Sequence, residues 1–343
     1  MVCVAAFIIL VLIGVFVAAI SIFKRDFGRR YLKALKKAFH CFGKKVRLQK
    51  CDTNFSDDVK SLLLRKVILK KPKLVKPLSI TIEIASVLLV VLTVWSIIEA
   101  AKAGLSLWVF GTCNISQPSN CALGADSCGL DEDNLNWFTE WGELFSNIPD
   151  RLKTWNAADY DDFAFAFATG NMDSDNIALS IIDPGCSVCL QSYKNIQKSD
   201  TFLKNHQLRI VLYPIRNTNG ELRFKNSELI TRFILATNQI MKNLGYSEKI
   251  INRLFTEYDK NGTIYQSVFN NELNTDEALS LLSEWLNEWG IAPEAVAKIR
   301  ETLYSQEITN QLEHNIELVN SKIKPKGIPT MIYDGKKHLG LYK

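Results

Sequence analysis

The stretch Ile181-Ile182-Asp183-Pro184-Gly185-Cys186-Ser187-Val188-Cys189 places two cysteines three residues apart where the sequence pattern changes. Before it, residues 176–182 are apolar and rich in β-branched side chains, which predicts a buried strand. After it, residues 190–196 carry apolar side chains at helical spacing. We therefore expect Cys186 where a strand passes into a helix, with Cys189 one turn deeper.

Two cysteines on a first helical turn lie close enough to form a disulfide. Unpaired N–H groups and the positive end of the helix dipole favour thiolate there, and thiolate is the form that attacks disulfides. The pattern predicts Cys186 as an exposed attacking thiolate and Cys189 as the thiol that resolves a mixed disulfide. Half of a zinc site and a bridge that only staples a loop are the alternatives.

A second informative stretch lies near residue 330. Gly327-Ile328-Pro329-Thr330 is followed by the strand-like Met331-Ile332-Tyr333, the turn Asp334-Gly335 and Leu339-Gly340-Leu341. This predicts a loop and a strand pair, and a proline in the loop permits a cis bond at modest cost.

Together the two stretches resemble the thioredoxin fold of thiol–disulfide oxidoreductases of the DsbA type, with DsbC and DsbG as near relatives. In that fold a cis-proline loop lies against the Cys-x-x-Cys pair. The resemblance covers residues 172–343, with residues 207–214 as the next strand. It implies an α/β thioredoxin-like fold with a large helical insertion at about 222–324.

The resemblance also implies roles for particular residues. Cys186 and Cys189 would be catalytic, and Ile328, Pro329 and Thr330 would present backbone to a bound peptide. Asp183 would aid proton transfer to or from Cys189, or act only as a turn or capping residue. No metal and no cofactor is expected.

The direction of electron flow stays open. DsbA-type proteins usually carry a histidine between the two cysteines, whereas Ser187 and Val188 have neither charge nor an imidazole ring. Oxidase, reductase and isomerase activity therefore all remain alternatives. The three histidines in this half of the chain, His206, His314 and His338, are interpreted as solvated or structural.

Two apolar segments precede this half of the chain. Residues 1–23 contain no charge and predict a first transmembrane helix, since about 20 apolar residues span a bilayer. A secretory signal is disfavoured, because no basic residue precedes the apolar run and no small-residue cleavage site follows it. Residues 78–101 predict a second transmembrane helix, with Glu83 near the headgroups and Trp95 near the far interface.

Charge fixes the expected topology. Residues 24–77 contain 18 Lys/Arg and 4 Asp/Glu, a net charge of +14, against 23 and 32 elsewhere, a net charge of −9. The positive-inside rule makes residues 24–77 a basic cytoplasmic loop near anionic lipids, with docking of a cytoplasmic partner or a nucleic-acid contact as the alternative. Residues 102–343 then lie outside the cytoplasm, in the periplasm or at the outer cell face of a bacterium, anchored in the inner membrane. Their acidic balance argues against nucleic-acid binding.

Cysteine positions agree with an oxidising compartment, because five of the eight lie after the second apolar segment. The linker region 102–171 contains Cys113, Cys121 and Cys128. One bridge plus one free thiol is the simplest arrangement, with pairing to another chain or a redox relay to Cys186 as alternatives. Cys41 and Cys51 are expected to be reduced, and a zinc pair with His40 lacks a four-ligand set.

Apolar periodicity predicts five helices in the insertion. They run from about Leu229 to Leu244, Glu248 to Asp259 after a Ser247 cap, Thr275 to Gly290, Pro293 to Leu303, and Ser305 to Ile323. The pattern of residues 161–167 fits a strand or the edge of a helix.

The resemblance therefore implies a membrane-anchored disulfide exchange protein. Its partners would be cysteine-containing exported proteins, a redox partner that recycles the dithiol, and membrane lipids. The fold normally closes with a further helix after the strand pair, and none is predicted here before Lys343. The missing helix supports an alternative, a catalytically silent thioredoxin-like adaptor or assembly factor of an envelope or secretion complex.

Overall fold

The structure is a computed structural model that describes residues 33, 36–40, 44, 64, 72–118, 126–130, 135–242 and 245–342. The chain divides into two compact units, residues 1–101 and 102–343. The first predicted transmembrane helix, residues 1–23, lies outside the described residues, as do Cys41, Cys51 and Cys121.

A single long helix, α4 (Val75–Phe110), follows the short 3-10 turn η1 (Pro72–Leu74) and contains the second predicted transmembrane segment. At 1.5 Å per residue its 36 residues extend over about 54 Å. Its most apolar 18-residue window has a mean hydropathy of 2.3, and apolar side chains such as Leu92 and Ile97 are exposed. Within the described part of the chain, α4 is the one helix long and apolar enough to cross a membrane.

The second unit is built on a five-stranded sheet of order β2-β4-β3-β6-β7. The strands are β2 (Phe167–Gly170), β3 (Ile177–Ile182), β4 (Gln207–Leu212), β6 (Thr330–Tyr333) and β7 (Lys336–Leu339). β3 and β4 run parallel, whereas β2–β4, β3–β6 and β6–β7 are antiparallel. A parallel pair needs a crossover, which α7 (Ser187–Gln197) and α8 (Asp200–Asn205) supply.

The sequence explains the central position of β3. Five of its six residues are buried, as expected for a strand covered on both faces. Ile181 pairs with Thr330 of β6 at one side and with Val211 of β4 at the other. The β6–β7 hairpin turns at Asp334 and Gly335, both with positive φ, as the predicted Asp-Gly turn requires.

A separate two-stranded ladder was not predicted. β1 (Cys128–Gly129) pairs antiparallel with β5 (Gly327–Ile328), directly before the proline loop. The linker that contains Cys128 therefore returns to the thioredoxin-like sheet region.

The predicted strands at 176–182 and 207–214 and the predicted hairpin are confirmed. Of residues 161–167, for which the sequence pattern fits a strand or a helix edge, only Phe167 belongs to a strand. The 3-10 helix η3 (Ala157–Tyr160) ends before this segment, and β2 begins at Phe167. α5 (Trp137–Ser146) and α6 (Ile148–Leu152) precede this segment.

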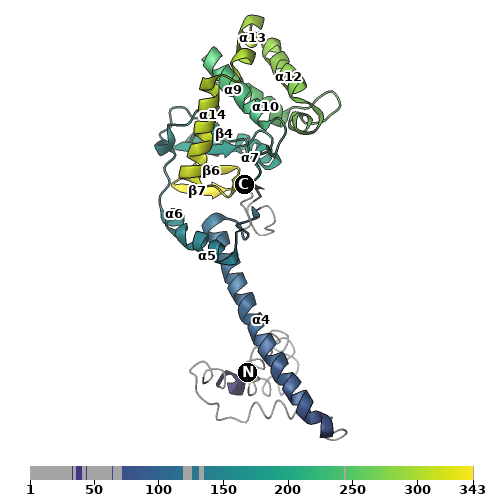
Figure 1. Cartoon of the computed structure of the whole chain (residues 1–343). Helices are drawn as coiled ribbons and strands as arrows, with labels where there is room; N and C mark the ends of the chain where they lie inside the picture. The colour runs from purple at the N-terminus through teal and green to yellow at the C-terminus, as the bar shows by residue number, and fades with distance from the viewer. Residues whose placement is uncertain are drawn as a thin grey trace, which may run out of the picture. The chain divides into compact units, whose positions relative to one another are not determined.

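Helices between β4 and β5 form the predicted insertion (Figure 1). They are α9 (Ser227–Met241), α10 (Gly245–Thr256), α11 (Tyr265–Ser267), the π-helical η4 (Val268–Glu272), α12 (Thr275–Glu288), α13 (Pro293–Thr302), α14 (Gln306–Leu318) and the π-helical η5 (Val319–Ile323). The predicted starts at Thr275 and Pro293 are confirmed, and α14 begins one residue after the predicted start at Ser305, which is its N-cap.

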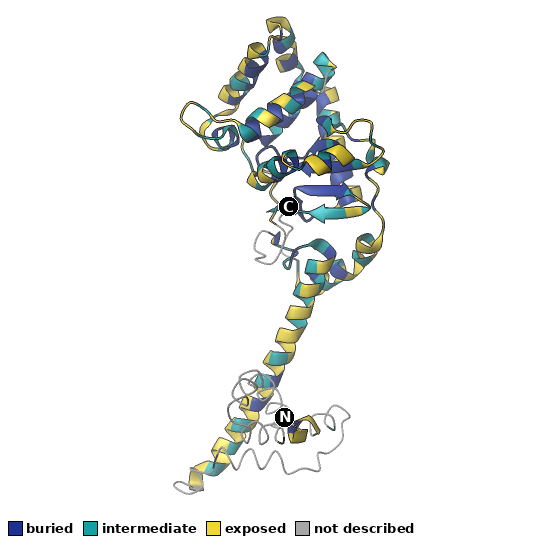
Figure 2. Cartoon of the chain, turned by 180° about the vertical axis from the view of Figure 1, so that it is seen from behind, coloured by how far each residue is buried: buried dark blue, intermediate teal, exposed yellow. Residues whose placement is uncertain are grey.

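One predicted cap is wrong. Ser247 lies inside α10, which already begins at Gly245, and its hydroxyl donates to Asn238 Oδ1 at 2.6 Å. The hydroxyl therefore links α10 to α9 instead of capping a helix. Figure 2 shows the result of this packing, with buried residues along the strands and on the inner faces of the insertion helices.

Candidate functional site

Cys186 lies at the junction that the sequence predicts. β3 ends at Ile182, and Cys186 is the N-cap of α7, with extended backbone and no side-chain cap hydrogen bond. The first-turn N–H groups of α7 thus have no side-chain partner from the cap and face the Cys186 end of the helix. Cys189 follows in the first turn and is fully buried.

The proline loop lies against this helix start, although 142 residues separate the two in sequence. The Ile328–Pro329 peptide bond is cis, and Cys186 Sγ lies 3.8 Å from the carbonyl oxygen of Ile328. Thr330 Oγ1 donates to Gly327 O at 2.7 Å and closes the loop. The structure therefore brings Cys186, Ile328, Pro329 and Thr330 together.

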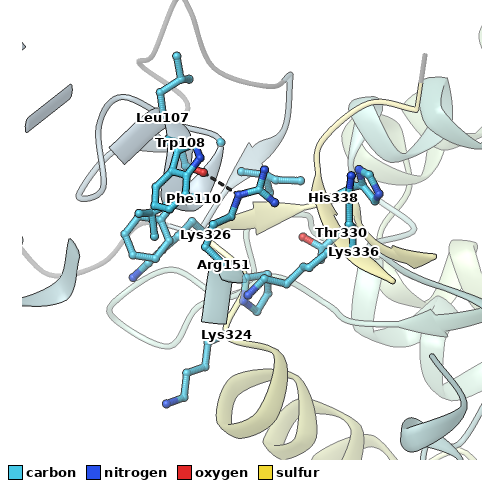
Figure 3. A pocket seen from close by; sticks show the side chains of 14 residues that line it. Leu107, Trp108, Phe110, Arg151, Lys324, Lys326, Thr330, Lys336 and His338 are labelled. Atoms are coloured by element: carbon cyan, nitrogen blue, oxygen red, sulfur yellow. Dashed lines mark hydrogen bonds between the residues drawn. The ribbon is translucent and has the colours of Figure 1, made fainter. Parts of the chain in front are cut away.

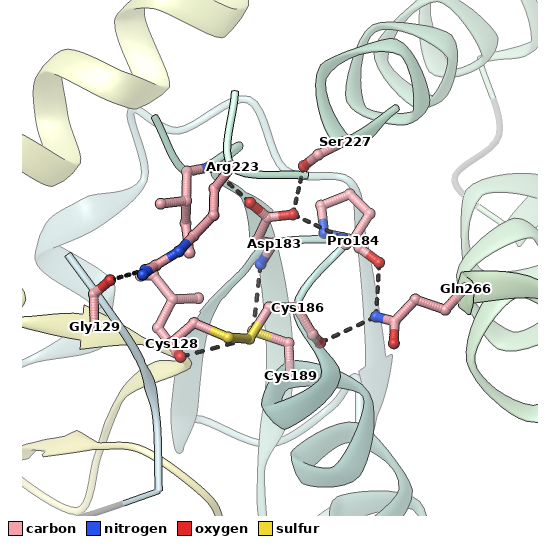
Figure 4. The surroundings of a disulfide bond; sticks show 12 residues. Cys128, Gly129, Asp183, Pro184, Cys186, Cys189, Arg223, Ser227 and Gln266 are labelled. Atoms are coloured by element: carbon pink, nitrogen blue, oxygen red, sulfur yellow. Dashed lines mark hydrogen bonds between the residues drawn. A yellow bond between two sulfur atoms is a disulfide. The ribbon is translucent and has the colours of Figure 1, made fainter. Parts of the chain in front are cut away.

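The state of the cysteines differs from the prediction. Cys186 forms its disulfide with Cys128, whereas Cys189 is a free, buried thiol (Figure 4). The predicted exposure of Cys186 is wrong, since its exposed fraction is 0%. The reason is local: the segment that carries Cys128 pairs with β5 and covers the sulfur.

Asp183 is fully buried near this disulfide (Figure 4). Its Oδ1 accepts from Gly185 N at 2.7 Å and from the Ser227 hydroxyl, and its Oδ2 accepts from Ile215 N at 2.6 Å. Burial raises the pKa of Asp183 from 3.8 to about 6, while these hydrogen bonds and the Arg223 charge oppose the rise. A carboxyl with such a pKa changes charge near neutral pH, which suits a proton acceptor.

Cys189 and Asp183 are coupled through the backbone. The Asp183 N–H donates to Cys189 Sγ at 3.4 Å. Burial raises the pKa of Cys189 well above its usual value, the nearby Asp183 charge raises it further, and the N–H contact lowers it. Cys189 is therefore a protonated thiol at neutral pH and needs a proton acceptor before it can attack.

The helical insertion holds the loop that precedes Cys186. Gln266 Nε2 donates to Pro184 O at 2.8 Å and to Cys186 O at 3.0 Å, and Asn270 Nδ2 donates to Gly185 O at 2.8 Å. Gly185 is required here, because a Cβ would lie 2.3 Å from Phe224 Cβ.

Sequence reasoning missed several of these residues. Ser227, Gln266, Asn270 and Arg223, whose guanidinium donates to Gly129 O, all come from distant segments without a motif. Only for Cys128 did the sequence contain an indication: the linker has an odd number of cysteines, so one of them can pair elsewhere.

Other predicted features lie away from this site. Cys113 is disulfide-bonded. The part of the chain that the structure describes contains no group of three or more potential metal ligands. His206 is structural: it stacks on Phe202, and its Nε2 lies 3.0 Å from Asp334 Oδ1.

A basic pocket of about 310 Å³ lies between the end of α4 and β7 (Figure 3). Arg151, Lys324, Lys326, Lys336 and Lys337 line it beside Trp108 and Phe110. Arg151 Nε donates to Trp108 O at 2.9 Å. Burial lowers the pKa of Lys337 to about 8, and the charges of Lys153, Lys326 and Lys324 lower it further, against the effect of Asp150.

Residues 102–343 contain a thioredoxin-like α/β domain rich in helix. Its marks are the strand order, the parallel β3–β4 unit, the cis-proline loop and the Cys-x-x-Cys pair at a helix start. No known protein-family model matches the chain, and no curated protein sequence matches it.

Similar solved structures are thiol–disulfide proteins at low identity. A thioredoxin-like oxidoreductase from Silicibacter pomeroyi DSS-3 is 15% identical with a TM-score of 0.36, over 52% of this chain and 84% of that one. The thiol–disulfide exchange protein α-DsbA2 from Wolbachia pipientis is 15% identical with a TM-score of 0.35, over 51% and 80%. BdbD from Bacillus subtilis is 16% identical with a TM-score of 0.37, over 50% and 82%. Similarity of this extent says nothing about activity, which has to be argued from the site.

Proposed function

We propose that this chain is a membrane-anchored thiol–disulfide oxidoreductase that exchanges disulfides with exported proteins. One observation carries the proposal: Cys186, at the start of α7, lies 3.8 Å from the backbone of Ile328 beside cis-Pro329. A helix start favours the Cys186 thiolate, and an adjacent strand edge can hold an extended polypeptide next to it.

In this mechanism Cys186 attacks a substrate disulfide and forms a mixed disulfide. Cys189 then attacks Cys186, which releases the substrate thiolate and leaves the Cys186–Cys189 disulfide. Asp183, whose backbone nitrogen lies 3.4 Å from Cys189 Sγ, accepts the Cys189 proton, since its carboxyl has a pKa of about 6. Ile328, Pro329 and Thr330 position the substrate backbone.

The proposed location is extracytoplasmic. α4 would span a bacterial inner membrane in contact with its lipids, and the basic residues 24–77 would stay in the cytoplasm. Disulfides at Cys113 and at Cys128–Cys186 in the second unit suit an oxidising compartment. A second redox protein would recycle the dithiol. Cleavage of residues 102–343 by a protease added outside spheroplasts supports this topology, and full protection contradicts it.

The test is turnover by the full chain in detergent. We expect insulin reduction in the presence of dithiothreitol and loss of that activity in Cys186→Ser. We expect substrate mixed disulfides trapped on Cys186 in the Cys128→Ser/Cys189→Ala double variant, because neither Cys128 nor Cys189 can then displace the substrate. The reduction potential of the Cys186/Cys189 pair determines whether the protein works as oxidant or reductant.

A silent thioredoxin-like adaptor is the second candidate, and one observation favours it: the exposed fractions of Cys186 and Cys189 are both 0%. An adaptor would show no turnover in either redox direction and would bind its partner equally well as the Cys186→Ser variant.

A further inference from the structure

The short strand β1 occupies the edge on which a bound peptide would pair. Cys128 faces Ile328 and Gly129 faces Gly327 in an antiparallel register. Leu130 N donates to Lys326 O at 3.1 Å, so the pairing continues beyond the two-residue ladder. At its other end Leu341 N donates to Asp126 O at 2.9 Å.

The close fit extends to side chains. Gly327 has no room for a Cβ, which would lie 2.7 Å from Ser127 Oγ and 3.1 Å from Cys128 O. Arg223 donates to Gly129 O from the other side. Cys128 itself is joined to Cys186, the residue that would hold a substrate cysteine (Figure 4).

We propose that residues 126–130 are a tethered internal substrate and that Cys128 is a third redox cysteine of this site. The inference rests on the proposed function, because it assigns the Cys128–Cys186 bond to an intramolecular mixed disulfide. It deepens that function by naming the class of polypeptide that the edge of β5 accepts.

The exchange step balances within the chain. The Cys189 thiolate attacks Cys186 Sγ, the Cys186–Cys189 bond forms, and the Cys128–Cys186 bond breaks. Cys128 leaves as a thiolate and takes up the proton that Cys189 lost. The chain stays oxidised by two electrons throughout, so no external oxidant or reductant is needed. This step frees the β5 edge when residues 126–130 depart.

The tethered segment also defines the external substrate. A competing polypeptide must be extended around its cysteine, with a small residue before it, as Ser127 is, and a small residue after it, as the buried Gly129 is. It must also place a carbonyl within reach of Arg223.

Disulfide mapping of the oxidised full chain in detergent tests the linkage. We expect Cys189→Ser to carry the Cys128–Cys186 bond in nearly every molecule, because the resolving thiol is gone. Cys128→Ser should carry the Cys186–Cys189 bond instead. Absence of the Cys128–Cys186 bond from Cys189→Ser overturns the inference.

A second pair of variants tests the strand without removing a thiol. Leu130→Pro removes the N–H that donates to Lys326 O, whereas Leu130→Ala keeps it. We expect the fraction of Cys128–Cys186 bond to fall severalfold in Leu130→Pro relative to Leu130→Ala. Equal fractions in two folded variants overturn the role of the strand.

Exchange rates separate this inference from the proposed function. The probe is a peptide with the sequence of residues 125–131, Ala-Asp-Ser-Cys-Gly-Leu-Asp, carried as a glutathione mixed disulfide. Because a tethered strand competes at an effective concentration in the millimolar range, we expect reduced Leu130→Pro to react about tenfold faster than reduced Leu130→Ala. The peptide with Val in place of Gly should react about fivefold more slowly.

Equal rates in reduced Leu130→Pro and reduced Leu130→Ala overturn the tethered strand and leave the proposed function standing. If the wild type carries the Cys128–Cys186 bond and reduced Cys128→Ser does not react with the peptide, both the tethered substrate and the proposed function are overturned. The Cys128–Cys186 bond is then a structural crosslink.

Discussion

Gln266 and Cys186 are joined by a hydrogen bond of 3.0 Å from the Gln266 amide to the Cys186 carbonyl. The same amide donates to Pro184 O at 2.8 Å, and Gln266 is 4% exposed. The helical insertion thus supports the backbone of the redox loop directly, in addition to lying beside it. This contact explains how a loop with no side-chain cap of its own keeps a fixed position.

Gln266→Ala should therefore loosen the loop. Loss of the donor leaves the buried Pro184 carbonyl without this partner, which costs about 1–3 kcal/mol. We expect a lower thermal unfolding midpoint and faster alkylation of Cys189 by N-ethylmaleimide. Gln306→Ala is the matched control, because the Gln306 amide bonds only to exposed Asn310 on its own helix. Unchanged Cys189 alkylation in Gln266→Ala would contradict the support that we assign to this contact.

Asp183 should make stability depend on pH in the acidic range. Its folded-state pKa of about 6 is above the unfolded value of 3.8, so the folded chain binds the extra proton between these pH values. Its stabilising contribution is complete below pH 3.8 and is lost as pH rises through 6, a difference of about 3 kcal/mol. Urea unfolding of the full chain in detergent at pH 4 to 7 measures it. We expect Asp183→Asn to lose this slope, and a slope equal to that of the wild type would show that another group titrates.

The sequence predicted the central strands and the hairpin of the fold, but it did not predict which cysteines are bonded to each other. The apolar, β-branched run, the Asp-Gly turn and the proline loop are local signals, and they identified β3 and the β6–β7 hairpin. The resemblance identified β4. The pairing of Cys128 with Cys186 depends on a strand of two residues, Cys128 and Gly129, which is too short to produce any periodicity.

The same limit applies to the network around Asp183. Ser227 and Ile215 reach its carboxylate only because β4 and α9 pack beside β3, and no local pattern reports that packing. Sequence spacing placed Cys186 and Cys189 on one helical turn. It could not exclude a third cysteine from competing for Cys186, because linkers contribute no spacing rule.

Lys337 should produce the opposite dependence at alkaline pH. Its folded-state pKa of about 8 lies below the unfolded value of 10.5, so the unfolded chain binds the extra proton between these values. Stability should rise with pH across this range on account of Lys337. Lys337→Met keeps the apolar stem near Trp155 but removes the titrating group. Denaturation of both proteins from pH 7.5 to 10 should give a shallower rise for Lys337→Met, and parallel curves would refute the assignment.

Gly327→Ala should separate the tethered strand from the rest of the fold. Gly327 does not have a positive φ, so its backbone accepts alanine, and the added Cβ would conflict with the Ser127 side chain and Cys128 O. We expect a folded protein with a smaller fraction of Cys128–Cys186 bond and severalfold faster alkylation of Cys186 after partial reduction. Gly142→Ala in α5 is the control, since nothing lies within 4 Å of its added Cβ. That change should stabilise the helix by about 0.5–1 kcal/mol and leave the disulfide fractions unchanged. If the two alanine variants show the same disulfide fractions, the close approach of Gly327 to Cys128 does not exist in solution.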